Sequence, residues 1–313
     1  MSTQQPTRRK IAVIDCGTNT FALNIYETSD GRQFRRVYKE RYFVELLEES
    51  RDFIGTAPYQ RALSAHYNFA QTLLQHDIHR LRAFGTAALR MASNGAKLME
   101  EIHESTGIEI ELIDGMREAE LIYRGVRLAA PDTEGTMLIM DIGGGSVEFI
   151  LCNKSEIFWA QSFNIGAAVL YDMFRPSDPI EESTIERMRM ELGDLLAPLW
   201  AAAERFPSHV LVGASGTFDV IGAMHNPTRR RHAKAYEPIP SEFFLNEVYD
   251  KLIYSSYEQR LSMHDLPHTR AKLIVGVVVL IRLVIERLKL PTLAISDYAL
   301  REGAAWEILQ AEG

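Results

Sequence analysis

The sequence predicts an α/β fold, because strand-like and helix-like stretches alternate along its 313 residues. Apolar, strand-like runs lead into glycine-containing turns at three places, "DCGTNT", "DIGGGS" and "GASGT". Stretches with a helical spacing of apolar residues lie between these turns. The first two turns share the order strand, acidic residue, glycine turn, strand, so we expect two similar halves.

The first half is expected to begin with a hairpin and to continue with alternating helices and strands. The predicted elements are a hairpin over 10–27, a helix over 59–79, a short strand running into a helix over 81–90, a strand over 107–115 and a helix over 116–130. The repeat places the boundary in the stretch "AAPDTEG", so the first half is assigned to residues 1–128 and the second to 129–313.

The second half is expected to follow the same plan with longer helices. Its predicted elements are a hairpin over 135–153, a helical stretch over 180–206, a strand, turn and helix over 209–224, a helix over 270–290, a strand over 292–296 and a helix over 299–309.

The composition is that of a globular protein, with 46% hydrophobic residues. A net charge of −8 argues against a nucleic-acid binder that relies on a positive field. The longest apolar run, residues 273–281, is broken by Arg282 and is typical of a buried helix, so we expect no membrane contact. Two cysteines, Cys16 and Cys152, cannot form a disulfide framework, which favours a soluble protein of a reducing cytoplasm.

Two clusters of basic residues depart from the acidic average. Arg35, Arg36, Lys39 and Arg41 form one, and "TRRRHAK", residues 228–234, forms the other. A solvated loop is the ordinary interpretation of such a run, and a groove for an anionic substrate is the alternative.

Glycine-rich turns after strands can bind phosphate, because the backbone N–H groups are accessible to its oxygen atoms. Any one of the three turns could be only a tight turn, but together they favour a phosphate site. No lysine follows as in a Walker A loop, and the dinucleotide fingerprint is absent. Asp15 and Asp141 would repel a phosphate unless a cation lay between, and Mg²⁺ suits carboxylates and phosphate oxygens.

The motifs "DCGTNT", "GTAALR", "DGMREAELIYRGV", "DIGGGSVEF", "VGASGT" and "SDYALREG" lie in this order between about residues 10 and 308. In this combination the chain resembles the exopolyphosphatase and guanosine pentaphosphate phosphohydrolase family, within the actin-like, sugar-kinase-like and heat-shock-like ATPases. The resemblance implies two ribonuclease-H-like lobes, an active site in the cleft between them, and a short form without the C-terminal helical domain of long members. A homodimer is plausible by the same resemblance.

The resemblance also implies roles for individual residues. Glu118 matches the catalytic glutamate that activates a water molecule, and Asp15, Asp141 and Glu148 match acids that would bind Mg²⁺, another divalent cation, or its waters. Expected phosphate contacts come from the three turns and one arginine: Gly17, Thr18, Asn19, Arg90, Gly143, Gly144, Gly145, Ser146, Gly213, Ser215, Gly216 and Thr217.

Plain structural interpretations stay open for several of these residues. Arg90 could be a surface arginine of a helix, and Glu148 an alternating strand residue that faces solvent. Cys16 has no histidine near it in the sequence and is read as a small hydrophobic residue. The chain also departs from the family pattern at residues 39–50, and at Lys272, where an aspartate is frequent.

The leading functional expectation is a Mg²⁺-dependent exopolyphosphatase that removes the terminal phosphate of inorganic polyphosphate. Hydrolysis of guanosine pentaphosphate is the alternative at the same site. A kinase of the same superfamily is disfavoured by "REAELIYRGV", and a non-catalytic phosphate or nucleotide sensor by the presence of Glu118.

Overall fold

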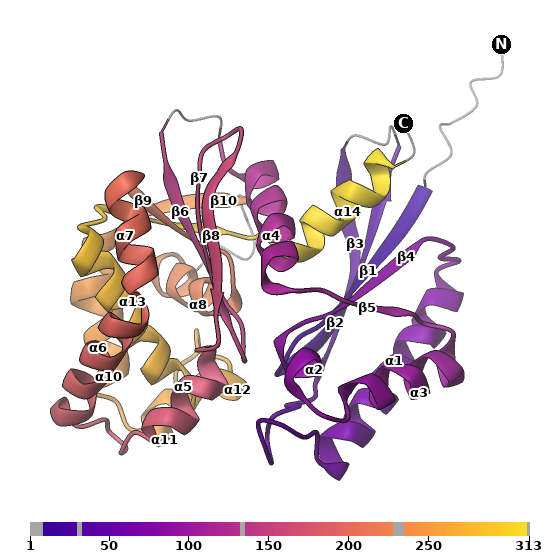
Figure 1. Cartoon of the computed structure of the whole chain (residues 1–313), viewed down its shortest axis with the longest axis horizontal. Coiled ribbons are helices and arrows are strands. Elements are labelled where there is room, and N and C mark those ends of the chain that lie inside the picture. The colour runs from indigo at the N-terminus through magenta and orange to yellow at the C-terminus, as the bar shows by residue number, and fades with distance from the viewer. Residues whose placement is uncertain (1–8, 30–32, 132–134, 228–234, 312–313) are drawn as a thin grey trace. The chain divides into compact units, whose positions relative to one another are not determined.

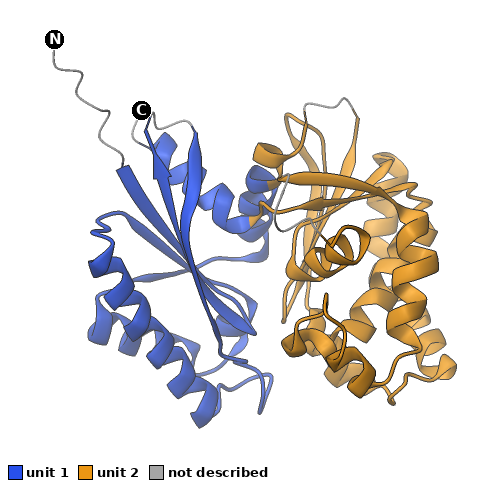
Figure 2. Cartoon of the chain, turned by 180° about the vertical axis from the view of Figure 1, so that it is seen from behind, with its two compact units in different colours: residues 1–125, 300–313 blue, residues 126–299 orange. Residues whose placement is uncertain are grey.

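The computed structural model describes residues 9–29, 33–131, 135–227 and 235–311 (Figure 1). They form two compact units (Figure 2): unit 1 comprises the chain up to Gly125 and from Leu300 onward, and unit 2 is Val126–Ala299. Each unit contains one mixed sheet with helices packed against it. The predicted α/β fold with two similar lobes is therefore confirmed.

Unit 1 is built on a five-stranded sheet in the order β3-β2-β1-β4-β5. The strands are β1 (Arg9–Cys16), β2 (Thr20–Thr28), β3 (Phe34–Phe43), β4 (Leu81–Gly85) and β5 (Ile110–Leu112). The first three form an antiparallel meander, and β4 and β5 run parallel to β1. The helices are α1 (Thr56–Gln75), α2 (Ala87–Met91), α3 (Gly95–Thr106), α4 (Gly115–Ala129) and α14 (Leu300–Gln310).

The two faces of this sheet differ in character. Ala12, Ile14 and Leu23 point to one face and belong to the hydrophobic core with Phe69 of α1 and Leu98 of α3. The other face carries α14, which lies on the opposite side of the sheet from α1 and α3 (Figure 1). Period-two alternation places Asp15 on this second face, together with the buried Ile11 and Val13.

Unit 2 has a six-stranded sheet in the order β10-β11-β9-β6-β7-β8. The strands are β6 (Met137–Ile142), β7 (Val147–Cys152), β8 (Ile157–Phe163), β9 (Val210–Gly213), β10 (Tyr236–Pro240) and β11 (Thr292–Ser296). The helical segments are α5 (Ala167–Phe174), α6 (Glu182–Leu195), α7 (Ala197–Arg205), α8 (Gly216–His225), α9 (Ser241–Phe243), the π-helix η2 (Phe244–Val248), α10 (Tyr249–Ile253), α11 (Tyr257–Leu261), α12 (His268–Ala271) and α13 (Ile274–Leu288). The apolar run predicted to be a buried helix is α13, whose residues from Ile274 to Ile281 are all buried.

The internal repeat read from the sequence is present in the topology. In unit 1 the meander β1-β2-β3 is followed by β4 parallel to β1, and in unit 2 the meander β6-β7-β8 is followed by β9 parallel to β6. In each meander an acidic residue lies near the end of the first strand, Asp15 in β1 and Asp141 in β6, and the turn that follows contains glycine.

The expected division at 128/129 assigned the last helix to the second half of the chain, but α14 belongs to unit 1. Tyr26 Oη of β2 donates a 2.7 Å hydrogen bond to Oε1 of Glu302, which is buried in α14. Gly303 lets α14 approach α4 closely, since a Cβ at this position would lie 1.9 Å from the carbonyl oxygen of Leu121. These contacts join residues that are far apart along the chain, which local sequence patterns do not reveal.

Two further expectations differ from the structure. The basic cluster at 35–41 lies on strand β3 and not in a loop, since its residues pair along β2. The helical stretch over 180–206 is divided into α6 and α7 at Leu196, two residues before Pro198. No helix in the part of the chain that the structure describes is long and apolar enough to cross a membrane.

Candidate active site

The first two glycine turns are closed in the same way. In unit 1 the N–H of Gly17 donates to the carbonyl oxygen of Thr20 at 3.2 Å, and in unit 2 Gly143 donates to Ser146 at 2.9 Å. A Cβ on either glycine would lie 3.2 Å from that acceptor, so both turns are tight enough to favour glycine. The turns at Gly17–Asn19 and Gly143–Gly145, called loop 1 and loop 2 below, are structurally equivalent.

The carbonyl groups of both loops are held by the protein. In loop 1, the carbonyls of Thr18 and Asn19 accept hydrogen bonds from the N–H groups of residues 44–46. In loop 2, the carbonyls of the three glycines accept from residues 166–168, at the start of α5. Because C=O and N–H point in opposite directions across a trans peptide, the N–H groups that follow these carbonyls point away from the segments that hold them. Each loop can therefore present backbone donors to an anion.

Asp15, which precedes loop 1, lies among basic side chains. Its Oδ2 is 3.5 Å from Nη1 of Arg301 on α14. The strand register aligns Asp15 with Ala22 and Ala22 with Arg41, so Arg41 lies two strands away on the same face of the sheet. Burial raises the pKa of Asp15, and Arg301 and Arg41 partly oppose that shift. This one member of the basic cluster thus belongs to the surroundings of loop 1.

Arg90 and Glu118 are brought to the same edge of the unit 1 sheet as loop 1. Loop 1, α2 and α4 follow the carboxyl ends of the parallel strands β1, β4 and β5, which meet at one edge. Nη1 of Arg90 on α2 lies 3.5 Å from Oε2 of Glu118 on α4 and also donates to the carbonyl oxygen of Ile113. Glu118 is buried, with 8% of its surface exposed. Glu118 is therefore not an exposed acid of the helix surface, and the side chain of Arg90 is only partly exposed.

Glu120, two residues farther along α4, behaves differently. It is ion-paired with Arg117 at 3.0 Å and its side chain is half exposed. This is the position of an ordinary acid on a helix surface.

Asp141 and Glu148 face each other across the strands that flank loop 2. They are paired in the antiparallel register of β6 and β7, which puts both side chains on one face. Glu148 is buried, and its Oε1 accepts a 2.7 Å hydrogen bond from Ser162 Oγ on β8, so it is not a solvent-facing strand residue. Two carboxylates suit Mg²⁺, which usually takes one or two from the protein together with waters and phosphate oxygens. A closed cage is not present: the described residues contain no group of three or more His, Cys, Asp or Glu that could hold a metal ion.

The third turn, at the carboxyl end of β9, has a different construction. Ala214 donates to the carbonyl of Met140, which sets this turn beside the start of loop 2. Gly213 is required by packing, since a Cβ would overlap the ring of Phe218. Ser215 is the N-cap of α8, and its buried Oγ has no hydrogen-bond partner among residues 9–29, 33–131, 135–227 and 235–311. A buried hydroxyl with no hydrogen-bond partner among these residues, at the N-terminus of a helix, could donate a hydrogen bond to an anionic ligand.

Arg270 of α12 lies against the third turn, and it was not among the site residues expected from the sequence. Its guanidinium lies so close to Gly216 that a Cβ on the glycine would overlap it. Burial lowers the pKa of Arg270, and the nearby Asp219 of α8 opposes that shift. The neighbouring Lys272, noted in the sequence as a departure, instead lies over the ring of Tyr171 at 4.5 Å. No local pattern distinguishes the two cations, because the fold alone brings the Arg270 side chain to Gly216, 54 residues earlier in the chain.

Cys16, which also precedes loop 1, has a histidine partner that is distant in sequence. Its Sγ is 3.4 Å from Nε2 of His66 on α1, in the buried core. Burial raises the pKa of the Cys16 thiol well above its usual value and lowers that of His66 to about 4. Both groups are neutral near pH 7, so the interpretation of Cys16 as a small hydrophobic residue fits its environment.

The expected site residues are divided between the two units. Unit 1 holds Asp15, loop 1, Arg90 and Glu118, and unit 2 holds Asp141, Glu148, loop 2 and the third turn. The second basic cluster, at 228–234, lies outside the described residues.

Known proteins resemble the chain over almost its whole length. A model of the Ppx/GppA phosphatase family matches residues 25–312. An exopolyphosphatase from Cytophaga hutchinsonii, known from its crystal structure, shares 35% sequence identity with this chain. The two structures match with a TM-score of 0.92 over 97% of this chain and 98% of that one. A Ppx/GppA family member from Aquifex aeolicus is 21% identical, with a TM-score of 0.83 over 98% and 99%, which supports the fold.

Proposed function

Because the chain belongs to the Ppx/GppA phosphatase family and is thus a hydrolase, we propose that it releases the terminal phosphate of inorganic polyphosphate. The observation that carries this proposal is the buried Glu118, which is ion-paired with Arg90 at the same sheet edge as loop 1. A buried carboxylate at the same sheet edge as backbone donors for phosphate suits the hydrolysis of a phosphoanhydride.

In the proposed reaction Glu118 orients a water molecule and accepts its proton as the oxygen attacks the terminal phosphorus. The bond from that phosphorus to the bridging oxygen breaks, and the shortened polyphosphate leaves with the bond electrons. Negative charge spreads over the phosphoryl oxygens in the transition state, where backbone N–H groups of loop 1 stabilise it. Arg90, whose Nη1 lies 3.5 Å from Oε2 of Glu118, is the residue we propose to orient this carboxylate.

Asp141 and Glu148 are the residues we propose for Mg²⁺ or another divalent cation, with Asp15 as a further candidate. When bound, the cation would supply positive charge to phosphate oxygens. Asp15 already has Arg301 as a cationic neighbour, so its contribution to metal binding is expected to be smaller than that of the Asp141 and Glu148 pair.

The test compares orthophosphate release from short polyphosphate, long polyphosphate and guanosine pentaphosphate at equal concentrations, with and without Mg²⁺. Glu118→Gln should lower kcat by roughly 10²- to 10⁴-fold while polyphosphate still binds. Glu120→Gln is the matched control, because it removes a carboxylate of the same helix that is paired with Arg117, and it should retain activity. Equal rates in wild type and Glu118→Gln would overturn the mechanism. Faster hydrolysis of guanosine pentaphosphate than of polyphosphate would identify it as the substrate. If the protein binds these compounds but hydrolyses none of the three, it would instead be a sensor.

A further inference from the structure

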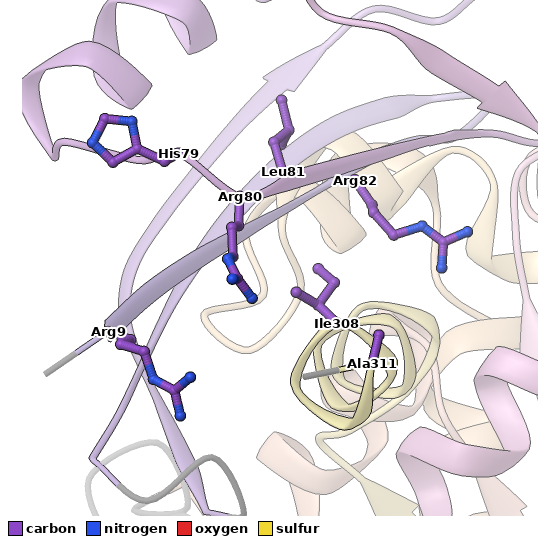
Figure 3. Close-up of a pocket in the computed structure, with 7 residues that line it drawn as sticks. All are labelled: Arg9, His79, Arg80, Leu81, Arg82, Ile308 and Ala311. Atoms are coloured by element: carbon purple, nitrogen blue, oxygen red, sulfur yellow. The ribbon is translucent and has the colours of Figure 1, made fainter. Parts of the chain in front are cut away.

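One carboxylate of α14, that of Glu307, is shared by three arginines of unit 1. Its Oε2 accepts hydrogen bonds from Nη1 of Arg82 on β4, at 3.1 Å, and from Nη2 of Arg117 on α4. Its Oε1 lies 3.3 Å from Nε of Arg124, also on α4, and the Glu307 side chain is only 15% exposed. Figure 3 shows Arg82 extending from β4 on one side of the end of α14, beside the cavity that it lines with Ile308. Glu307 therefore joins β4, α4 and α14, which are far apart in the sequence.

The facing sides of α4 and α14 explain this convergence. Arg117, Leu121 and Arg124 follow one another at spacings of four and three residues, so they lie on one face of α4. Gly303 and Glu307 are four residues apart and lie on one face of α14. The backbones are closest at Gly303, where a Cβ would lie 1.9 Å from the carbonyl oxygen of Leu121. Glu307, one turn later, is thereby brought within reach of both arginines of α4.

Arg117 directly precedes Glu118, the proposed base, in the first turn of α4. The N–H of Arg117 donates to Oδ1 of Asp114 at 2.8 Å, and that of Glu118 donates to the carbonyl oxygen of Asp114 at 2.9 Å. The end turn of a helix has fewer backbone hydrogen bonds than its middle and opens more easily. The contact with Glu307 adds a link from this turn to α14, and the hydrogen bond raises the pKa of Arg117 above its usual value. Any displacement of the turn would move the carboxylate of Glu118 with it.

Glu120 pairs with the same arginine but connects it to nothing outside the helix. Its carboxylate lies 3.0 Å from Nη1 of Arg117, three residues earlier on α4, and its side chain is 47% exposed. An exposed pair within one helix contributes little to its position. Glu120 is thus a matched comparison for Glu307.

We propose that Glu307 is a positioning residue of the active site, which holds the first turn of α4 through Arg117 and so directs the carboxylate of Glu118. The proposal rests on the proposed function of Glu118 as the base. A small misdirection of a catalytic group is costly, whereas the donors of loop 1 that would bind phosphate belong to another segment. Loss of Glu307 should therefore lower kcat and leave substrate binding nearly unchanged.

The experiment compares Glu307→Gln with Glu120→Gln, since each removes one carboxylate that pairs with Arg117. Steady-state release of orthophosphate from tripolyphosphate gives kcat and KM. Calorimetry with tripolyphosphate in the Glu118→Gln background gives the affinity without turnover. Amide hydrogen exchange of residues 115–121 reports the opening of the first turns of α4 without any substrate.

We expect Glu307→Gln to lower kcat roughly tenfold or more and to speed hydrogen exchange of residues 115–121. KM and the affinity for tripolyphosphate should change by less than about twofold. Glu120→Gln should resemble wild type in every measurement. In the Glu118→Gln background, Glu307→Gln should cause no further loss of the residual kcat, because it acts through Glu118.

An unchanged kcat or unchanged exchange in Glu307→Gln overturns the proposal, even with a lower unfolding temperature, since Glu307 would then only stabilise the fold. A fall in tripolyphosphate affinity as large as the fall in kcat overturns it too, because the effect would not be confined to Glu118. If Glu307→Gln does not fold, Arg117→Gln cuts the same link, leaves Glu307 paired with Arg82 and Arg124, and should give the same results. Absent orthophosphate release by the wild-type protein would be a failure of the proposed function. Normal wild-type turnover that Glu307→Gln does not change would be a failure of this proposal alone.

Discussion

Nη1 of Arg90 lies 3.5 Å from Oε2 of Glu118, and the same guanidinium donates to the backbone carbonyl of Ile113. One arginine thus ties the carboxylate of α4 to the segment that leads from β5 into that helix. The contact spans 28 residues of sequence and joins two motifs, "GTAALR" and "REAELIY", that the sequence offers only as separate signals.

Arg90→Gln should therefore lower kcat by roughly 10- to 100-fold and change KM less, because a small misdirection of a catalytic group is costly. Steady-state orthophosphate release from polyphosphate measures both constants. Arg35→Gln is the control, since it removes an arginine–glutamate pair from the exposed part of β3. An unchanged kcat in Arg90→Gln would mean that Glu118 does not need this partner.

Arg270 and Lys272 provide a second matched pair, because both are cations at α12 but only Arg270 reaches the third glycine turn. Arg270→Gln should weaken polyphosphate binding by roughly tenfold, the loss expected for one hydrogen-bonded charge. Lys272→Gln should leave binding close to wild type, since it loses only a contact with Tyr171. Equilibrium binding in the Glu118→Gln background checks both values, and an equal effect of the two substitutions would contradict a specific role for Arg270.

Those parts of the fold and of the site that depend on short patterns along the chain can be predicted from the sequence. The hairpins with Asp15 and Asp141, the third turn and the buried α13 are all visible as periodicity and turn chemistry. The family motif selects Glu118 from the other acids of its helix, although its role as the base is still a prediction.

Contacts between distant segments could not be predicted in this way. Arg301 lies beside Asp15, Arg270 beside Gly216 and His66 beside Cys16 only because helices pack on particular faces of the sheets. Strand β3 is not predicted either, because alternating charges on an edge strand resemble a solvated loop. Arg41 of this strand can be placed near Asp15 only once the pairing of β1, β2 and β3 is known.

His66 predicts how stability depends on pH. Its folded-state pKa is about 4, below the ordinary value of 6.5, because burial disfavours the imidazolium ion. The unfolded chain takes up the proton first, so the stabilisation is complete above pH 6.5 and is lost as the pH falls toward 4, by about 3 kcal/mol in total.

His66→Phe should remove this part of the pH dependence, since Phe21 and Phe69 already contact the ring. Urea unfolding between pH 7 and pH 4 measures the free energy of unfolding in each protein. His103→Gln, at an exposed position of α3, is the control and should retain the wild-type slope. An identical slope in His66→Phe would show that His66 does not titrate in this way.

Gly303 and Gly193 predict opposite effects of the same substitution in two helices. A Cβ at Gly303 would lie 1.9 Å from the carbonyl oxygen of Leu121, and a backbone atom cannot move aside as a flexible side chain can. Gly303→Ala should therefore force α14 away from α4 and lower the free energy of unfolding by roughly 1–3 kcal/mol or more. A Cβ at Gly193 of α6 would meet no atom of the described residues within 4 Å, so Gly193→Ala should raise stability by about 0.5–1 kcal/mol. Chemical denaturation of the two variants tests the pair, and a Gly303→Ala protein as stable as wild type would show that α14 does not need this close approach to hold Arg301 and Glu302 against the sheet.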